Sequence, residues 1–222
     1  TLNLNDKTLT LGSESTDLTV SEAIIMNEAD EQIRTNSADL TLNGLLTVVE
    51  GGIDSDNGTL TFSGGIEQSG GVLNINSSLL ELGADVYKTG GILNTPATSV
   101  TIINNLTITS NSLLSVTTIN LGTNELSLGS ASSDLLISDN LSLAEENVSL
   151  QTADADLTVK GDVILDEGEL NSTGGTLIFW KGGLQSGTFE FDLGASILRL
   201  SADYTKSGGT LYAASATLNL LD

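Results

Sequence analysis

The residues of this sequence that could carry out chemistry are its carboxylates. The chain has 29 Asp and Glu residues but no His and no Cys, which excludes a Ser-His-Asp triad, a cysteine nucleophile and a histidine-based zinc site. Two carboxylates can still act together, as in glycoside hydrolases. Such an active site also needs one asymmetric cleft with basic and aromatic residues, and the seven Lys and Arg residues are scattered along the chain. We therefore expect that the protein is not an enzyme.

One short segment has the spacing of an oxygen-ligand loop. Asp54, Asp56 and Asn57 precede Gly58, as at the start of a calcium loop, but the distal Glu that completes an EF-hand is missing. These three residues are the candidates for a metal site, and calcium is the cofactor that they suggest. The expectation from the sequence as a whole is that no cofactor is bound.

The sequence consists of two copies of one long repeat. Residues 118–222 align with residues 1–105 at an offset of 117, which becomes 118 after Ser78, and 18 of the first 44 positions are identical. A long-period repeat is typical of an array in which each unit contacts mainly its neighbours. We predict a first copy at 1–117 and a truncated second copy at 118–222, joined in one continuous rod. Because the second copy is cut short and the chain begins without Met, we expect an excerpt from a longer tandem protein.

The repeat weighs against calcium and favours a structural role for Asp. The counterpart of the candidate loop is residues 171–175, which contain no carboxylate, whereas a metal site that serves the repeat should occur in both copies. Three other Asp residues are matched between the copies, each before a predicted strand. An Asp there is expected to accept hydrogen bonds from nearby backbone N–H groups of a turn. The matched pairs are Asp17 and Asp134, Asp39 and Asp156, and Asp85 and Asp203.

Inside each copy, short apolar-polar-apolar segments recur about every 20 residues. One series of apolar residues is Leu40, Leu42, Leu60, Phe62, Leu80, Leu82, Val100 and Ile102, which we expect to form one face of the core. A second row is Ile66, Val86, Leu106 and Leu126, and a third is Val72, Ile92, Leu113 and Leu135. Alternation turns every second side chain of a strand inward. The constant step predicts that these inward residues stack in ladders.

The pattern predicts an all-β fold, a parallel β-solenoid (β-helix) with about 20 residues and three short strands per coil. Helices are not expected because the i, i+3, i+4, i+7 spacing is absent and β-branched residues, Gly and Asn recur throughout. An antiparallel sandwich would also alternate, but it would not keep a constant register over ten blocks. Trp180, which replaces Ser63 of the first copy, is expected at the surface or in a turn.

The net charge of −22 limits the possible partners. Each copy carries a net charge of −11, so the charge belongs to the repeat and not to a tail. Nucleic acids and anionic lipids are bound through clusters of Lys and Arg. No apolar run approaches the ~20 residues of a transmembrane helix. We expect neither nucleic acid binding nor membrane insertion.

The strand pattern resembles that of the filamentous-haemagglutinin and autotransporter-passenger class of bacterial surface adhesins. The resemblance rests on Leu-Thr-Leu and Leu-Thr-Val segments at residues 9–11, Leu18–Val20, Leu40–Leu42 and Leu157–Val159, and on the turns Gly71-Val72-Leu73 and Gly209-Thr210-Leu211. It covers the whole chain at the level of pattern, and the regular 117-residue period departs from those families. The resemblance implies a right-handed, three-faced solenoid at the cell surface, with a stalk or fibre role.

The function expected from the sequence is therefore structural. The chain is interpreted as a repeat segment of an extracellular fibre or giant surface adhesin, acting as a stiff stalk whose partner is another copy of itself, stacked coil on coil. The alternative is a binding module, such as a phage tail fibre or a carbohydrate-binding β-helix. Exposed rows of aromatic residues would favour that alternative, and aromatic residues are only 4% of the chain.

Overall fold

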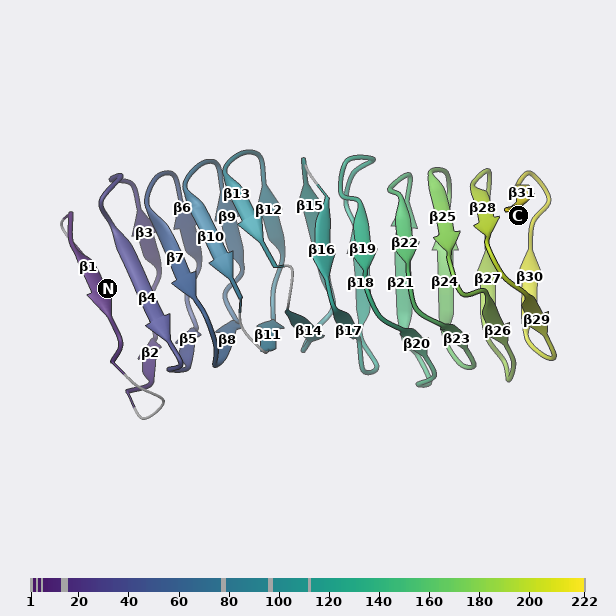
Figure 1. The fold of residues 1–222 in the computed structure, drawn as a ribbon, viewed down its shortest axis with the longest axis horizontal. Coiled ribbons are helices and arrows are strands. Elements are labelled where there is room, and N and C mark those ends of the chain that lie inside the picture. Colours follow the sequence, from purple (N-terminus) through teal and green to yellow (C-terminus); the bar gives the residue numbers. More distant parts are fainter. Residues whose placement is uncertain are drawn as a thin grey trace. The chain divides into compact units, whose positions relative to one another are not determined.

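The computed structural model describes residues 2, 4, 6–12, 16–76, 79–95, 98–111 and 113–221. Ser78, where the repeat offset changes, lies outside these residues. The chain divides into two compact units, Thr1–Leu106 and Thr107–Asp222. Every described element is a β-strand (Figure 1), which confirms the all-β prediction. Accordingly, no helix long and apolar enough to span a membrane occurs in the described part of the chain.

The first unit contains three parallel sheets, in which each strand pairs with the strand three further along the chain. The sheets have the orders β1-β4-β7-β10-β13, β2-β5-β8-β11-β14 and β3-β6-β9-β12. Each coil therefore contributes one strand to each sheet. The strands are β1 (Thr8–Thr10), β2 (Leu18–Val20), β3 (Ile24–Met26), β4 (Gln32–Asn36), β5 (Leu40–Leu42), β6 (Leu46–Val48), β7 (Gly52–Ser55), β8 (Thr59–Phe62), β9 (Ile66–Gln68), β10 (Val72–Ile75), β11 (Leu79–Leu82), β12 (Val86–Lys88), β13 (Ile92–Asn94) and β14 (Ser99–Ile102).

The second unit follows the same scheme. Its sheets have the orders β15-β18-β21-β24-β27-β30, β16-β19-β22-β25-β28-β31 and β20-β23-β26-β29. The strands are β15 (Leu106–Ser110), β16 (Leu114–Val116), β17 (Thr118–Asn120), β18 (Glu125–Leu128), β19 (Leu135–Ile137), β20 (Leu141–Leu143), β21 (Ser149–Ala153), β22 (Leu157–Val159), β23 (Val163–Leu165), β24 (Glu169–Ser172), β25 (Thr176–Phe179), β26 (Gly183–Gln185), β27 (Glu190–Asp192), β28 (Ile197–Leu200), β29 (Tyr204–Lys206), β30 (Thr210–Tyr212) and β31 (Thr217–Leu220).

The register between coils is the one that the sequence predicts. In the first unit the pairs advance by 20 residues along the column Leu40, Leu60, Leu80 and Val100. In the second unit the column is Leu157, Leu177, Leu198 and Leu218. Parallel coils of about 20 residues, stacked in register, define a β-solenoid, and this part of the prediction is confirmed. The right-handed winding, the boundary of the copies at 117/118 and the continuous rod stay predictions.

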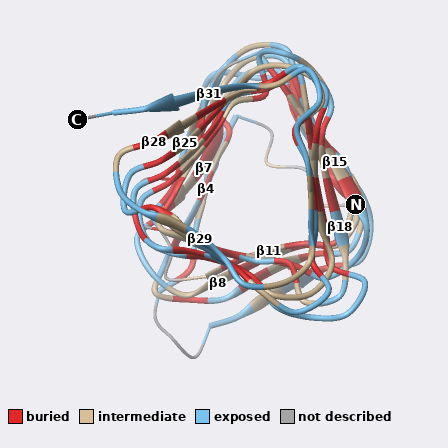
Figure 2. Ribbon diagram, turned by 90° about the vertical axis from the view of Figure 1, so that its right-hand side faces the viewer, coloured by how far each residue is buried: buried red, intermediate tan, exposed pale blue. Residues whose placement is uncertain are grey.

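The core lies on the inner side of the coils. Buried and exposed positions alternate along the strands, and the turns at the corners are mostly exposed (Figure 2). All eight residues predicted to form one face of the core are buried. Phe62 and Phe179, at equivalent positions of the two copies, have no exposed surface. Their burial removes large apolar areas from water, which is the main favourable contribution to folding.

The third predicted row of inward residues is wrong in direction at Val72, Ile92 and Leu113, whereas Leu135 is buried as predicted. Val72 pairs with Ile92, but Ile92 is exposed and Leu73 is the residue that points inward. Leu113 is also exposed, and its neighbour Leu114 pairs with Leu135. In both places two adjacent apolar residues fit the pattern. Since a shift by one residue exchanges the two faces of a strand, the pattern alone does not decide which residue is buried.

The outward columns differ between the copies far more than the inward ones. In the first copy one outward column is Thr19, Thr41, Thr61, Glu81 and Thr101. The Thr61 hydroxyl donates a hydrogen bond of 2.7 Å to the Glu81 carboxylate. The equivalent column of the second copy is Leu136, Thr158, Ile178, Arg199 and Asn219. The same register therefore carries hydroxyl, acidic, basic and aliphatic side chains on its outer side.

Candidate functional site

The calcium candidates lie in a strand and in the turn that follows it. Asp54 is part of β7, where it pairs with Arg34 on one side and Asn74 on the other. Asp56 and Asn57 are exposed in the turn. Ser55, between the two Asp residues, is buried and donates a hydrogen bond of 3.2 Å to the Asn57 carbonyl oxygen. The turn is thus held by backbone and hydroxyl groups, and the described residues contain no group of three or more His, Cys, Asp or Glu side chains that could hold a metal ion.

Removal of divalent cations is expected to leave the stability unchanged. The bonds at the candidate turn, from the Asn57 N–H to the Asn36 carbonyl (3.0 Å) and from Ser55 to Asn57, join protein groups directly. Thermal unfolding followed by circular dichroism, with and without EDTA, measures this. A fall of several degrees in Tm on chelation that calcium reverses, and that Asp54→Asn with Asp56→Asn abolishes, would show that these residues bind calcium.

Two of the three matched Asp pairs, Asp17 with Asp134 and Asp39 with Asp156, connect one coil to the next. The backbone N–H of Asp39 donates to the Asp17 carboxylate at 3.1 Å, and that of Thr59 donates to the Asp39 carboxylate at 2.6 Å. The sequence predicts a bond within the turn of the Asp itself, but the donors are 20 to 22 residues further along, at the same corner of the following coil. These bonds occupy N–H groups at a corner, where the sheet ladders are interrupted.

The second copy repeats these Asp bonds at the equivalent positions. The N–H of Asp156 donates to the Asp134 carboxylate at 2.9 Å, and that of Thr176 donates to the Asp156 carboxylate at 2.6 Å. Adding the offset of 117 to Asp17, Asp39 and Thr59 gives Asp134, Asp156 and Thr176. The bonds are therefore a property of the repeat, in both units.

Two buried glutamines form a second set of bonds between coils, which the sequence analysis did not identify. The Gln68 amide donates to the Ile92 carbonyl oxygen at 2.9 Å, and the Gln185 amide donates to the equivalent Thr210 carbonyl oxygen at 2.8 Å. Both side chains are buried. A polar residue retained at equivalent inward positions is the signal that could have revealed them. In each case the amide fixes the Gly-Gly turn of the following coil against the core.

Tyr204 completes the environment of the second glutamine. Its hydroxyl donates to the Gln185 side-chain oxygen at 2.8 Å, and burial raises the pKa of Tyr204 above its ordinary value. The phenol therefore remains a neutral donor throughout the physiological pH range. The equivalent residue of the first copy is Val86, and the Gln68 side-chain oxygen there has no hydrogen-bond partner among the described residues.

The last described coil has an apolar surface on one side. Among the described strands, β29, β30 and β31 have one neighbour each, which are β26, β27 and β28. Leu198 and Leu200 of β28, which has a strand on both sides, are 2% and 4% exposed, whereas Leu218 and Leu220 at the same positions of β31 are 60% and 73% exposed. The positions that are buried in the core in β28 are therefore exposed in β31.

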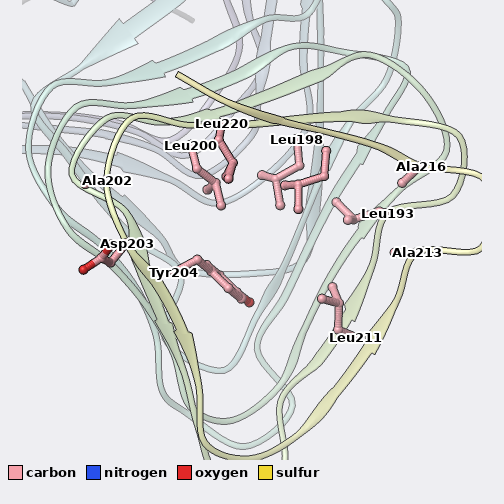
Figure 3. A pocket seen from close by; sticks show the side chains of 11 residues that line it. Leu193, Leu198, Leu200, Ala202, Asp203, Tyr204, Leu211, Ala213, Ala216 and Leu220 are labelled. Carbon is pink, nitrogen blue, oxygen red and sulfur yellow. The ribbon is translucent and has the colours of Figure 1, made fainter. Parts of the chain in front are cut away.

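A hollow of about 460 Å³ opens between these side chains. Figure 3 shows Leu193, Leu198, Leu200, Leu211 and Leu220 around it, with the Tyr204 ring at its base. We call this surface, formed by β29–β31 and these residues, the open coil face. Apolar side chains at the edge of a sheet with unpaired backbone groups are a site for association with another chain.

Comparisons of the chain with protein-family models, with curated proteins and with solved structures found no match. The fold is therefore assigned from the structure itself, as a β-solenoid. The likeness to adhesin repeats remains a likeness of strand pattern.

Proposed function

We propose that this protein is a structural repeat segment of an extracellular fibre or surface adhesin, and that it acts as a stiff stalk. The observation that carries the proposal is the repetition of the same coil-to-coil bonds in both copies. The Asp and Gln side chains described above join successive coils at equivalent corners. An array held together by contacts between neighbouring coils can be lengthened by adding copies, with no new kind of contact.

Charge and location fit this role. A net charge of −22 keeps such a segment soluble and prevents lateral clumping through repulsion. The extracellular location is proposed from the resemblance of the strand pattern to surface adhesins. A binding module is not proposed, since the exposed aromatic residues among those described, Tyr87, Trp180 and Tyr212, occupy three different positions of the coil and form no row.

The proposal includes lengthwise association through the open coil face. At low salt the like charges of two molecules oppose contact, and at about 1 M salt the screening length falls to about 3 Å. We therefore expect the protein to form larger species as protein and salt concentrations rise. Sedimentation velocity at low and high salt measures this.

Two double variants test whether the open coil face is the surface through which the molecules associate. Leu218→Lys with Leu220→Lys should keep the protein monomeric at high salt, because it places charges on the open coil face. Ile164→Lys with Leu184→Lys introduces the same charges on the outer side of β23 and β26, where both residues are exposed, and should leave association unchanged. A wild-type protein that stays monomeric at high concentration and high salt would contradict lengthwise stacking.

A further inference from the structure

The edge strands of the open coil face are almost free of charge, in a chain that is otherwise strongly acidic. Lys206 is the one charged residue within β29, β30 and β31, and residues 207–221 contain no charged residue. Proteins usually protect exposed sheet edges with charged residues, Pro or bulges. The strands β29–β31 contain no Pro, and their pairs with β26–β28 keep a regular register. This edge therefore lacks the usual protection against a further strand.

The sequence repeat shows where this uncharged stretch belongs. Residue 207 is equivalent to residue 89 at the offset of 118, and the corresponding uncharged stretch extends from residue 89 of the first copy to residue 124 of the second. This is 36 consecutive residues in a chain with 16% charged residues, and it spans the predicted junction between the copies. The part of the repeat where one copy follows another thus contains no charged residue, although each copy as a whole has a net charge of −11.

The same register identifies the coil that follows these strands in the repeat. Leu218 and Leu220 correspond to Val100 and Ile102 of β14. In the first copy β14 is followed by a coil that begins at Asn105 and comprises β15, β16 and β17. Residues 105–121 carry no charge, and their inward side chains Leu106, Ile108, Leu114, Val116 and Ile119 are all buried in this protein.

We infer that the open coil face binds one particular partner, a coil with the sequence of residues 105–121 supplied by another copy of the repeat. This inference rests on the proposed function, since it names the partner of the surface that the proposal uses. The inward side chains of such a coil would cover Leu218 and Leu220, and its backbone would continue the ladders of β29 and β31, the equivalents of β12 and β14. The coil is uncharged, and the open coil face carries only Lys206 in its strands and Asp203 at the edge of the hollow. Lys88, the equivalent of Lys206, is buried in the first unit, so the repeat accommodates a lysine at this position.

A fusion tests the identity of this coil. Residues 105–121 are appended after Asp222, and amide hydrogen exchange in β29–β31 is followed by mass spectrometry. Exchange there should slow by roughly tenfold or more, because exchange reports local opening of the last coil. The control fusion carries Lys at the appended positions of Leu106 and Ile108, and its exchange should match that of the unfused protein.

The outcomes separate this inference from the proposed function. Protection of β29–β31 by the wild-type fusion and not by the control supports the inference, even if the unfused protein never associates. Equal exchange in the two fusions overturns the inference. If the unfused protein nevertheless associates at high salt, the proposed function still holds, and the open coil face binds a different partner. The fusions are compared at matched circular dichroism, so that both retain the folded solenoid.

Discussion

Replacing Phe179 with alanine is expected to lower the free energy of unfolding by about 3–5 kcal/mol. Phe179 has no exposed surface, and its ring stacks on that of Phe191 with a centroid distance of 6.2 Å and an interplanar angle of 24°. The substitution removes the apolar contacts and leaves a cavity between strands that are fixed by their ladders. The coils cannot close this cavity without breaking the register, so the loss should be near the upper end of the range.

The next residue along the chain is the control. Trp180 is also a large aromatic residue, but it is 53% exposed. Trp180→Ala should therefore change the free energy of unfolding by less than about 0.5–1 kcal/mol. Urea denaturation of the two variants and the wild type measures both values. Equal losses at the two positions would contradict the inward orientation of Phe179.

Gly168→Ala is expected to destabilise the protein by about 2–4 kcal/mol, from backbone strain and overlap together. Gly168 has a φ of +82°, which side chains other than Gly rarely adopt. A Cβ at this position would also overlap the carbonyl oxygen of Val148 in the preceding coil. Gly51, the equivalent of Gly168, has a φ of +66° and faces the carbonyl oxygen of Glu31 in the same way. Thermal and urea unfolding of Gly168→Ala and Gly51→Ala should show losses of similar size.

Gly12→Ala is the matched control for these substitutions. A Cβ on Gly12 would meet no atom of the described residues within 4 Å, and its φ lies outside the left-handed region. The control should therefore be neutral, or slightly stabilising because Ala restricts the unfolded chain. If Gly168→Ala were as neutral as Gly12→Ala, the close approach of successive coils at this corner would be wrong.

The coil register could be predicted from sequence because two simple periods coincide. Alternation within a strand selects the inward residues, and the step of 20 residues places Leu40, Leu60 and Leu80 above one another. Both periods concern many residues at once, so a single exception does not hide them. The burial of the eight predicted core residues follows directly from this.

The bonds between coils could not be predicted in the same way. Glutamine is usually exposed, and Gln185 is buried only because the carbonyl oxygens of Phe189 and Thr210 lie within reach of its amide. The position of those oxygens depends on the turn of the following coil. The sequence correctly predicts that the Asp39 carboxylate accepts a hydrogen bond from a backbone N–H, but it places the donor in the turn of Asp39 itself. The donor is Thr59 of the following coil, and its position next to Asp39 is known only from the fold.

At the calcium candidates, the local spacing does not decide the structure, for a related reason. A loop that holds a metal ion gathers its oxygen ligands on one side, whereas Asp54 belongs to a strand and its neighbour Ser55 points into the core. Spacing along the chain does not distinguish a strand that ends in a turn from a loop that encloses an ion. Whether the exposed Asp56 and Asn57 bind calcium stays a prediction for the EDTA experiment.

The outward columns give the solenoid freedom to evolve. Thr61 and Ile178 occupy the same position of the repeat, as do Glu81 and Arg199, yet the pairs between coils are the same in both copies. The inward side chains and the corners therefore determine which strands pair, and the outward side chains have little influence on the fold. The charge and polarity of the outer surface can therefore diverge along one such chain by single substitutions, each tolerated independently of the others.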